Sequence, residues 1–318
     1  MAETIAFLCP GQGAQNVGMG ADLIAEFAPA REVFAEADDV LGFSLSALCA
    51  EGPDETLMQT ENAQPALLAM SVAVARILQV EGGLTPTVAA GHSLGEWSAL
   101  VVAGSLGLAD ALRAVRQRGL FMREAVPRGQ GGMSALLGVS PEEVAAVCAA
   151  STLGPDSFVG PANWNGGGQV VVAGHVAALD RLEAAAREGK KRATRLKVSQ
   201  PFHSPLMAPA RERLEEVLAD LDFQPMQIPV VANVTAANIT DEKMWPGLLA
   251  EQVTAAVRWE ECATSVSEQA ECAIEVGSGR VLSGLMRRIA RGYPCRPTGN
   301  VDGVRAILDD QAGGATDE

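Results

Sequence analysis

Residues 87–102, TVAAGHSLGEWSALVV, determine the fold expected for this chain. The short stretch 87–90 is typical of a buried strand, and 96–102 is typical of a buried helix. Between them, Gly91-His92-Ser93-Leu94-Gly95 fits G-x-S-x-G, in which small residues flank a serine on a tight strand-to-helix turn. The pentapeptide alone arises often by chance, but the flanking strand and helix support it. The stretch therefore predicts α/β architecture with an exposed serine on the turn.

The rest of the chain extends this pattern on both sides. A strand at residues 4–9 runs into a glycine-rich loop, and the nearly all-apolar residues 64–79 predict a buried helix. Residues 109–125 predict an amphipathic helix, and strands return at 229–233 and 273–275. We therefore expect a large α/β-hydrolase-like domain built on a parallel sheet.

A different pattern begins after Pro127. The expected elements are a strand at 133–137, a helix opened by Ser140 and Pro141, strands at 157–161 and 169–173, a helix at 176–188 and a strand at 193–198. This βαββαβ order is typical of a ferredoxin-like unit. We expect a small inserted domain at 129–199, a large domain at 1–128 and 200–310, and a frayed tail at 311–318.

Composition limits the classes of partner. The chain has 318 residues, 48% of them hydrophobic, and a formal charge of −15, which disfavours nucleic acid because phosphate binding needs a basic surface. No run of about 18 consecutive apolar residues predicts a membrane span. The start, MAETIAFLCPGQG, lacks the basic region and cleavage signal of a secretory peptide. We expect a cytoplasmic monomer that binds neither nucleic acid nor membrane.

Metal binding is not expected, whereas one local charge cluster is notable. The six cysteines are far apart without a CxxC pair, and only three histidines are present. Residues 187–197 carry six of the 24 basic residues, opposed in sequence only by Glu188. This segment is either a solvated helix end and strand edge or a docking patch for an acidic partner. The docking interpretation centres on Lys190, Lys191, Arg192 and Arg195.

A serine nucleophile needs a base, and the three histidines make the search short. His92 adjoins Ser93, and neighbouring side chains on a tight turn usually point apart. His175 opens an expected helix in the small domain, where a surface histidine is common. His203 lies in Gln200-Pro201-Phe202-His203-Ser204-Pro205, a proline-bracketed loop where the chain re-enters the large domain. By elimination, His203 is the best candidate for the base.

The first glycine-rich loop, Pro10-Gly11-Gln12-Gly13-Ala14-Gln15, is a poor match to a phosphate-binding loop. It lacks the third glycine of G-x-G-x-x-G, because position 16 is Asn, and has no G-K-S/T. Such glycines also bring backbone and polar side chains close to a reacting group. Gln12 is therefore a candidate donor to an oxyanion.

Several segments in order, spanning about residues 5–307, resemble one family: the malonyl-CoA:acyl carrier protein transacylases and the related acyltransferase domains of fatty acid and polyketide synthases. The segments that carry the resemblance are FLCPGQGAQNVGMG, ENAQPALLA, GHSLGEWSAL, RQRGLFMREAV, NWNGGGQVVVAG, VSQPFHSPLM and EVGSGRVLSGL.

The resemblance implies roles for individual residues. Ser93 matches the nucleophile and His203 the base, while Gln12 and the amide of Leu94 match the oxyanion donors. Gln252 matches the position whose backbone carbonyl orients the histidine.

The resemblance also implies a set of substrate-binding residues. Arg118 matches the arginine that pairs with the malonate carboxylate, which suits the two-pronged guanidinium. By contrast, Arg113 and Arg116 are expected to be solvated. Phe202 accompanies malonyl selection because its ring occupies the space that an α-methyl group would need. Met122, Gln64 and His92 complete the expected substrate-binding residues.

The implied activity is a ping-pong transfer of malonyl from malonyl-CoA to an acyl carrier protein for fatty acid synthesis, without metal or other cofactor. A stand-alone acyltransferase of a polyketide or polyunsaturated fatty acid pathway would share every motif. A serine esterase would keep Ser93 and His203, but would normally add an acidic third residue and would not need Arg118. A non-enzymatic interaction protein would have no reason to combine these groups.

Overall fold

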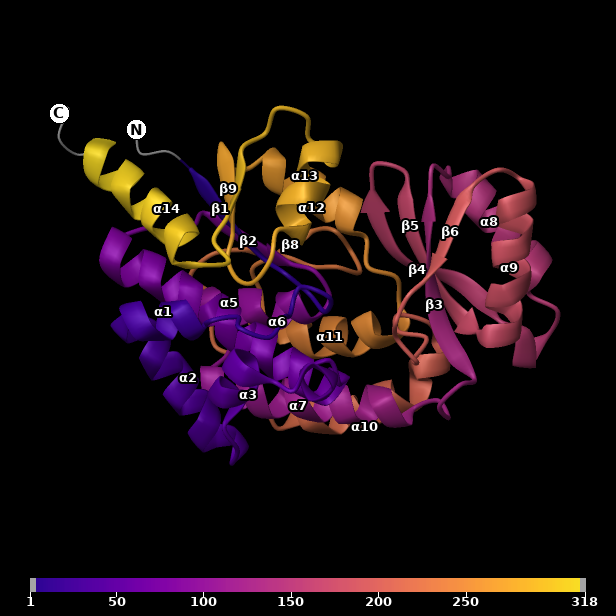
Figure 1. Ribbon diagram of the computed structural model, residues 1–318, viewed down its shortest axis with the longest axis horizontal. Helices are drawn as coiled ribbons and strands as arrows, with labels where there is room; N and C mark the ends of the chain where they lie inside the picture. Colours follow the sequence, from indigo (N-terminus) through magenta and orange to yellow (C-terminus); the bar gives the residue numbers. More distant parts are fainter. Residues whose placement is uncertain (1–3, 315–318) are drawn as a thin grey trace.

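The computed structural model describes residues 4–314, and it contains two β-sheets (Figure 1). The six strands of the first sheet are, in spatial order, β10 (Cys295–Pro297), β9 (Cys272–Glu275), β1 (Ile5–Cys9), β2 (Val88–Gly91), β7 (Val230–Val231) and β8 (Asn238–Ile239). All neighbouring pairs are parallel except β7 with β8. All five residues of β1 are buried, as expected for a central strand covered on both faces. The fold is therefore mixed α/β around a largely parallel sheet.

Successive side chains of β1 point to opposite faces of the sheet, so this strand contributes to two apolar clusters, one on each face. Ile5, Phe7 and Cys9 join the cluster that includes α5 (Thr60–Gly82) and α6 (Leu94–Val102), whereas Ala6 and Leu8 join the cluster that includes α12 (Trp259–Ser267) and α13 (Val281–Ile289). The helices outside the second sheet are α1 (Ala21–Glu26), α2 (Ala28–Leu41), α3 (Leu45–Glu51), α4 (Asp54–Leu57), α5 (Thr60–Gly82), α6 (Leu94–Val102), α7 (Leu108–Glu124), α10 (Ala208–Ala219), α11 (Trp245–Thr254), α12 (Trp259–Ser267), α13 (Val281–Ile289) and α14 (Val301–Gly314), with the 3-10 turns η2 (Pro205–Met207) and η3 (Glu242–Met244).

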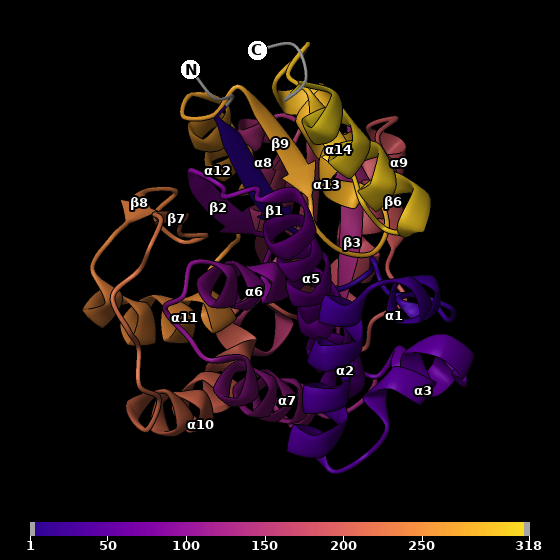
Figure 2. The same cartoon turned by 90° about the vertical axis from the view of Figure 1, so that its left-hand side faces the viewer.

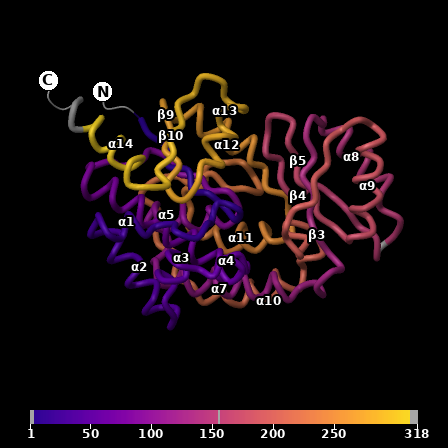
Figure 3. Tube along the Cα trace, viewed as in Figure 1, coloured from indigo at the N-terminus to yellow at the C-terminus, as the bar shows by residue number. Residues whose placement is uncertain are grey.

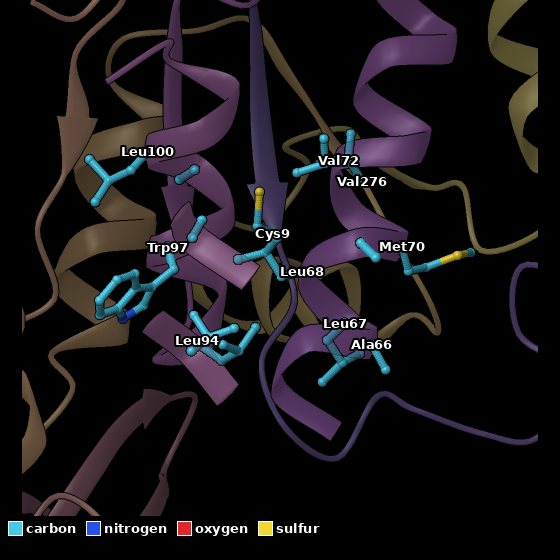
Figure 4. Close-up of a cluster of buried hydrophobic side chains, with 14 of the residues drawn as sticks. Cys9, Ala66, Leu67, Leu68, Met70, Val72, Leu94, Trp97, Leu100 and Val276 are labelled. Carbon is cyan, nitrogen blue, oxygen red and sulfur yellow. The ribbon is translucent and has the colours of Figure 1, made fainter. Parts of the chain in front are cut away.

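Helix α5 is the central core helix, as its apolar sequence predicts. It lies between α2, α6 and α7 (Figure 2). By length and composition it is apolar enough to cross a membrane, but 83% of its most apolar 18-residue window is buried inside the protein. Figure 4 shows side chains of α5 and α6, among them Leu68 and Leu100, gathered around Cys9 at the end of β1. The length of α5 is thus explained by packing within the protein.

The second sheet is antiparallel and is formed by one continuous segment (Figure 1). Along the chain the elements are β3 (Gly131–Leu137), α8 (Pro141–Ser151), η1 (Pro155–Ser157), β4 (Val159–Gly166), β5 (Gln169–His175), α9 (Val176–Glu188) and β6 (Arg192–Arg195), and the spatial strand order is β4-β5-β3-β6. Ser140 begins α8 with a capping box to Glu143, as its sequence predicts. The segment has its own apolar cluster between the sheet and its two helices.

The structure corrects several expectations about element ends. The strand expected at 193–198 ends at Arg195: the Leu196 backbone N–H still donates to the Met133 carbonyl oxygen at 2.9 Å, but the pairing with β3 does not continue beyond it. The strand expected at 157–161 is β4 at Val159–Gly166, and the strand expected at 229–233 is limited to β7 at Val230–Val231. The tail expected to fray from residue 311 is helical as far as Gly314, and residues 315–318 lie outside the described residues. Helix α14 packs on α1 and α5, so that segments from opposite ends of the sequence lie together (Figure 3).

Candidate active site

The tight turn between β2 and α6 places Ser93 in a strained backbone conformation, with φ of 52° and ψ of −106°. A Cβ atom on Gly91 would lie 1.9 Å from the backbone carbon of Gly95, and one on Gly95 would lie 2.0 Å from the carbonyl oxygen of Cys9. Both glycines are therefore required by close backbone approach. A Cβ on Gly11 would also lie 2.3 Å from the carbonyl oxygen of His92, so the first glycine-rich loop packs directly against the turn.

His203 contacts Ser93 across 110 positions of sequence. Its Nε2 lies 2.7 Å from the Ser93 Oγ, and its Nδ1 lies 2.8 Å from the backbone carbonyl oxygen of Gln252. Because a carbonyl oxygen only accepts, Nδ1 carries the proton of the neutral ring and Nε2 presents its lone pair to the serine. Burial, and then the positive charge of Arg118, lower the pKa of His203 to about 3. The ring is therefore a neutral base at physiological pH.

Arg118, on α7, is a buried cation beside the serine. Its side chain is 2% exposed; Nη1 donates to the Gln64 Oε1 at 2.7 Å, and Nη2 donates to the Gln252 Oε1 at 2.9 Å and to the Ser93 Oγ at 3.3 Å. Its Nε has no hydrogen-bond partner within the described residues. Burial lowers the pKa of Arg118 to about 10, so it remains charged at neutral pH. Neutral amides hold the guanidinium, and its charge is available to an acidic ligand.

A polar network behind the turn was missed by the sequence reasoning. Asn233 accepts the Ser93 backbone N–H at its Oδ1, 2.8 Å away, and donates from Nδ2 to the Gly91 carbonyl oxygen at 2.7 Å. Glu96 accepts from the Asn233 backbone N–H at 2.6 Å and from the Gln252 side chain. Burial raises the pKa of Glu96 to about 8. The sequence offered one indication of this network, because Glu96 is the one charged residue in a mostly apolar helix.

Gln252 contributes its side chain to the site as well as its backbone carbonyl. Besides the Arg118 and Glu96 contacts, its Nε2 donates to the Ser93 carbonyl oxygen at 3.0 Å. One side chain on α11 thus connects the turn, the buried cation and, through its own backbone, the histidine.

Ser93, His203 and Arg118 line a cavity of about 610 Å³ between the two sheets, a size typical of small-ligand sites. The remaining expected residues also line it: Gln12, Leu94, Phe202, Met122, Gln64 and His92. The Leu94 amide, at the first position of α6, donates to no acceptor among residues 4–314 and can face an oxyanion. The His92 Nε2 lies 2.9 Å from the Asn165 Oδ1, and both residues border the cavity.

A serine, a neutral imidazole and an unpaired backbone amide in one cavity are groups that acyl transfer requires. The sequence of residues 6–286 matches the model of the acyl transferase domain. The chain belongs to the acyl transferase family. This finding confirms the resemblance stated from the motifs.

Relatives within the acyl transferase family point to one subgroup. The chain is 46% identical over 286 residues to a malonyl CoA-acyl carrier protein transacylase from Salmonella typhimurium, covering 89% of this chain and 92% of the relative. It is 45% identical over 289 residues to the protein of the same name from Bacillus subtilis, covering 90% of each.

Solved structures of the family agree in fold. An acyl carrier protein S-malonyltransferase from Vibrio cholerae superposes with a TM-score of 0.92 at 43% identity, covering 96% of this chain and 99% of that one. A malonyl-transacylase structure in complex with its type II polyketide synthase acyl carrier protein superposes with a TM-score of 0.93 at 40% identity, with the same coverage.

The basic cluster at 187–197 is less uniform than its sequence indicates. Folding brings Glu143 to Lys191, and Asp180 and Glu183 to Arg195, so two of the expected docking residues are held in ion pairs. Lys190 and Arg192 are exposed and form no ion pair with any residue in 4–314. Lys197 is also exposed and borders the cavity.

Two other expectations are resolved by the structure. Arg113 is exposed and pairs with Asp110, as expected for a solvated residue. The prediction that Arg116 is solvated is wrong, because Arg116 is half-buried, donates to the Asn62 Oδ1 at 2.9 Å and stacks over the Phe43 ring.

A second hollow of about 460 Å³, between α11, α12 and β4, contains none of the expected site residues.

Proposed function

We propose that the chain transfers a malonyl group from malonyl-CoA to the phosphopantetheine thiol of an acyl carrier protein through an ester on Ser93. The observation that carries this proposal is the 2.7 Å contact between Ser93 and His203 beside the buried Arg118. The names of the relatives support the same substrates.

In the first half-reaction, His203 takes the proton of Ser93 at Nε2 while the Oγ bonds to the thioester carbonyl carbon. The Gln12 side chain and the Leu94 amide donate to the oxyanion. The carbon–sulfur bond then breaks, and the proton passes from His203 to the sulfur of coenzyme A. In the second half-reaction, His203 takes the proton of the carrier thiol, sulfur attacks the ester, and the proton returns to Ser93. The exchange of one thioester for another needs no metal and no other cofactor.

Arg118 provides the acyl selectivity in this proposal. A free malonyl carboxylate is planar and matches the guanidinium, whose charge no directly bonded carboxylate neutralises. Phe202, 9% exposed on the cavity wall, occupies the space that an α-methyl substituent would need. Met122, Gln64 and His92 shape the rest of the acyl pocket. Gln252 replaces the acidic third member that an esterase would bring, which favours the transferase over the hydrolase.

The assignment extends to the organisation and location of the protein. We infer an α/β-hydrolase-like large domain at 1–128 and 200–310, and an inserted ferredoxin-like domain at 129–199 whose βαββαβ order and antiparallel pairing support the name. The protein acts as a cytoplasmic monomer without membrane or nucleic acid partners. Fatty acid synthesis is the pathway we favour. The polyketide alternative keeps support from the likeness to a transacylase that serves a type II polyketide carrier.

The direct test is to incubate the protein with labelled malonyl-CoA and to locate the adduct by mass spectrometry, which we expect on Ser93. Arg118→Ala is expected to lower malonyl loading by about a hundredfold and acetyl loading by less than about fivefold, because only malonyl presents a carboxylate. Arg113→Ala, an exposed arginine on the same helix, is the matched control and is expected to load both groups normally. An adduct at another residue, or equal losses for both acyl groups, would refute the assignment.

A further inference from the structure

Glu96 is a carboxyl group buried beside the acyl pocket, and none of the reaction steps proposed above uses it. It is the third residue of α6, and its side chain is fully buried. One of its oxygens accepts from the Asn233 backbone N–H at 2.6 Å, and the other accepts from the Gln252 side chain. The same Gln252 amide turns its oxygen to Arg118, whose Nη2 donates to it at 2.9 Å. A single amide therefore separates Glu96 from the cation that is proposed to bind malonyl.

Arg118 and Glu96 balance each other's charge in this part of the protein. Arg118 is the one lysine or arginine that is buried in residues 4–314. Its charge lowers the pKa of Glu96, and the charge of Glu96 raises the pKa of Arg118. A malonyl carboxylate at Arg118 adds a second negative charge to a region that holds one cation. Because a buried charge without a partner is costly, one of the two carboxyl groups is expected to be neutral.

Glu96 is better suited than the malonyl group to be the neutral carboxyl. Burial raises the pKa of Glu96 to about 8, because it outweighs the hydrogen bonds from Asn233 and Gln252 and the charge of Arg118, which all lower it. Glu96 has no direct bond to Arg118, since Gln252 lies between them. A malonyl carboxylate bonded directly to the guanidinium is stabilised as an anion. At about pH 7 Glu96 is therefore mostly protonated, and the charge of Arg118 is left for the ligand.

The other ionisable groups packed around Glu96 do not titrate near pH 8. Strands β2 and β7 contain no ionisable side chain. Cys9 on β1 and Cys262 on α12 are thiols whose pKa values burial raises above the usual range. His92 and His203 are neutral, because burial lowers the pKa of each. The ionisable residues of α5, α11 and the rest of α7 are exposed or bonded to other groups. A titration in this range is thus assigned to Glu96.

We propose that Glu96 is a specificity-determining residue that acts through Gln252 and Arg118. Its neutral form leaves the cation to the malonyl carboxylate, and its ionised form competes with that carboxylate. This inference rests on the proposed function, in which Arg118 binds malonyl. Bound malonyl raises the pKa of Glu96 further, so a proton is taken up from solvent on binding above about pH 8. Malonyl binding therefore weakens as the pH rises through this range, whereas an acetyl group carries no carboxylate and is unaffected.

The first test compares malonyl with acetyl loading of Ser93 between about pH 7 and about pH 9. With its pKa at about 8, the neutral fraction of Glu96 falls from about nine-tenths to about one-tenth, so the ratio of malonyl to acetyl kcat/KM is expected to fall by about tenfold. The ratio cancels the pH dependence of steps that both acyl groups share. Arg118, with its pKa lowered only to about 10, keeps its charge over this range. In Glu96→Gln, a neutral side chain of the same size, the ratio should stay constant within about twofold.

The matched control is Glu275→Gln. Glu275 is also fully buried, and its carboxylate accepts from the backbone N–H groups of Leu282 and Ser283 at the start of α13. This variant also neutralises a buried carboxyl group, but one that is not bonded to Gln252 or Arg118. It is expected to lose stability and to keep the pH dependence of the unmodified protein.

A second measurement needs no variant. Ester formation is followed in weak buffer at about pH 8.5 with a pH indicator, first with malonyl-CoA and then with acetyl-CoA. Formation of the malonyl ester is expected to take up about half a proton more per Ser93 than formation of the acetyl ester. The release of coenzyme A is common to both reactions and cancels in the difference.

The outcomes separate this inference from the function on which it rests. The function stands if malonyl forms its ester on Ser93 and Arg118→Ala lowers malonyl loading selectively. In that case the part assigned to Glu96 is overturned by a ratio that is constant with pH, by equal proton uptake for both acyl groups, or by a folded Glu96→Gln protein that keeps the pH dependence. If no ester forms on Ser93, or if Arg118→Ala affects both acyl groups equally, the proposed function fails and this inference fails with it.

Discussion

His203 acts in this site without a carboxylate partner. A backbone carbonyl, that of Gln252, fixes its tautomer, and a nearby cation, Arg118, opposes its protonation. An aspartate in place of that carbonyl would raise the pKa of the ring and favour the imidazolium. The arrangement is suited to a cycle in which the base must release its proton twice, once to the thiolate of coenzyme A and once to Ser93.

The depressed pKa of His203 predicts an unusual pH profile. An ordinary histidine with a pKa near 6.5 would be about 97% protonated at about pH 5, which would slow loading roughly twenty-fivefold relative to about pH 7. With the pKa of His203 lowered to about 3, the neutral base persists, and we expect single-turnover malonyl loading to change by less than about twofold over this range.

Protein stability must be followed in the same experiment. Below a pH of about 6.5, a histidine in the unfolded chain binds a proton that the buried His203 does not bind, so the free energy of unfolding falls as the pH falls. Circular dichroism at each pH identifies the range in which the protein remains folded. A loading rate that drops with a midpoint near 6.5 in the folded protein would contradict the assigned environment of His203.

At the scale of elements, the site depends on how closely β1, β2 and α6 approach one another. Gly95, at the second position of α6, lies against the end of β1, and Gly91 ends β2 against the backbone of the same helix. Because no side chain separates these three elements, the turn is tight and places the Ser93 side chain at the cavity. Asn233, two residues after the end of β7, hydrogen-bonds to the turn at Ser93 and Gly91.

Gly95→Ala is expected to be damaging for this reason. The added methyl group would lie 2.0 Å from the Cys9 carbonyl oxygen, and the backbone must move. We expect a loss of about 3 kcal/mol or more in the free energy of unfolding, together with loss of Ser93 acylation. Gly247→Ala, on the exposed side of α11 with no atom within 4 Å of the added Cβ, is the control and is expected to stabilise by about 0.5–1 kcal/mol. Chemical denaturation compares the two, and equal stabilities would contradict the close approach.

The same elements show what the sequence can predict. The strand, turn and helix around Ser93 follow from adjacent residues, and with only three histidines in the chain, His203 was found by elimination. Asn233 and Glu96 were missed because their contacts join positions 137 to 142 residues apart, and local patterns carry no information about such pairs.

Over the whole molecule, charge is distributed unevenly. The chain carries a formal charge of −15, yet Lys190, Arg192 and Lys197 present exposed positive groups at and around β6, and Lys197 borders the cavity. Lys191 and Arg195 are neutralised by nearby carboxylates. Acyl carrier proteins are acidic, and we propose that the exposed members of the cluster guide the carrier to the cavity, because local complementarity accelerates encounter even when net charges repel.

Reversing the two exposed charges that lie outside the cavity tests this proposal. The double variant Lys190→Glu, Arg192→Glu is expected to lower kcat/KM for the carrier protein by about tenfold at low salt, whereas malonyl loading from malonyl-CoA changes by less than about twofold. Because solvent ions screen exposed charges, the difference should shrink as salt is raised to about 0.5 M. Lys243→Glu, an exposed lysine on η3, is the control for a change in net charge and should leave both half-reactions unaffected. The two half-reactions are measured separately, by loading of Ser93 and by its discharge to carrier protein. Equal effects on both would indicate that the cluster recognises coenzyme A phosphates or stabilises the fold, and would end the docking interpretation.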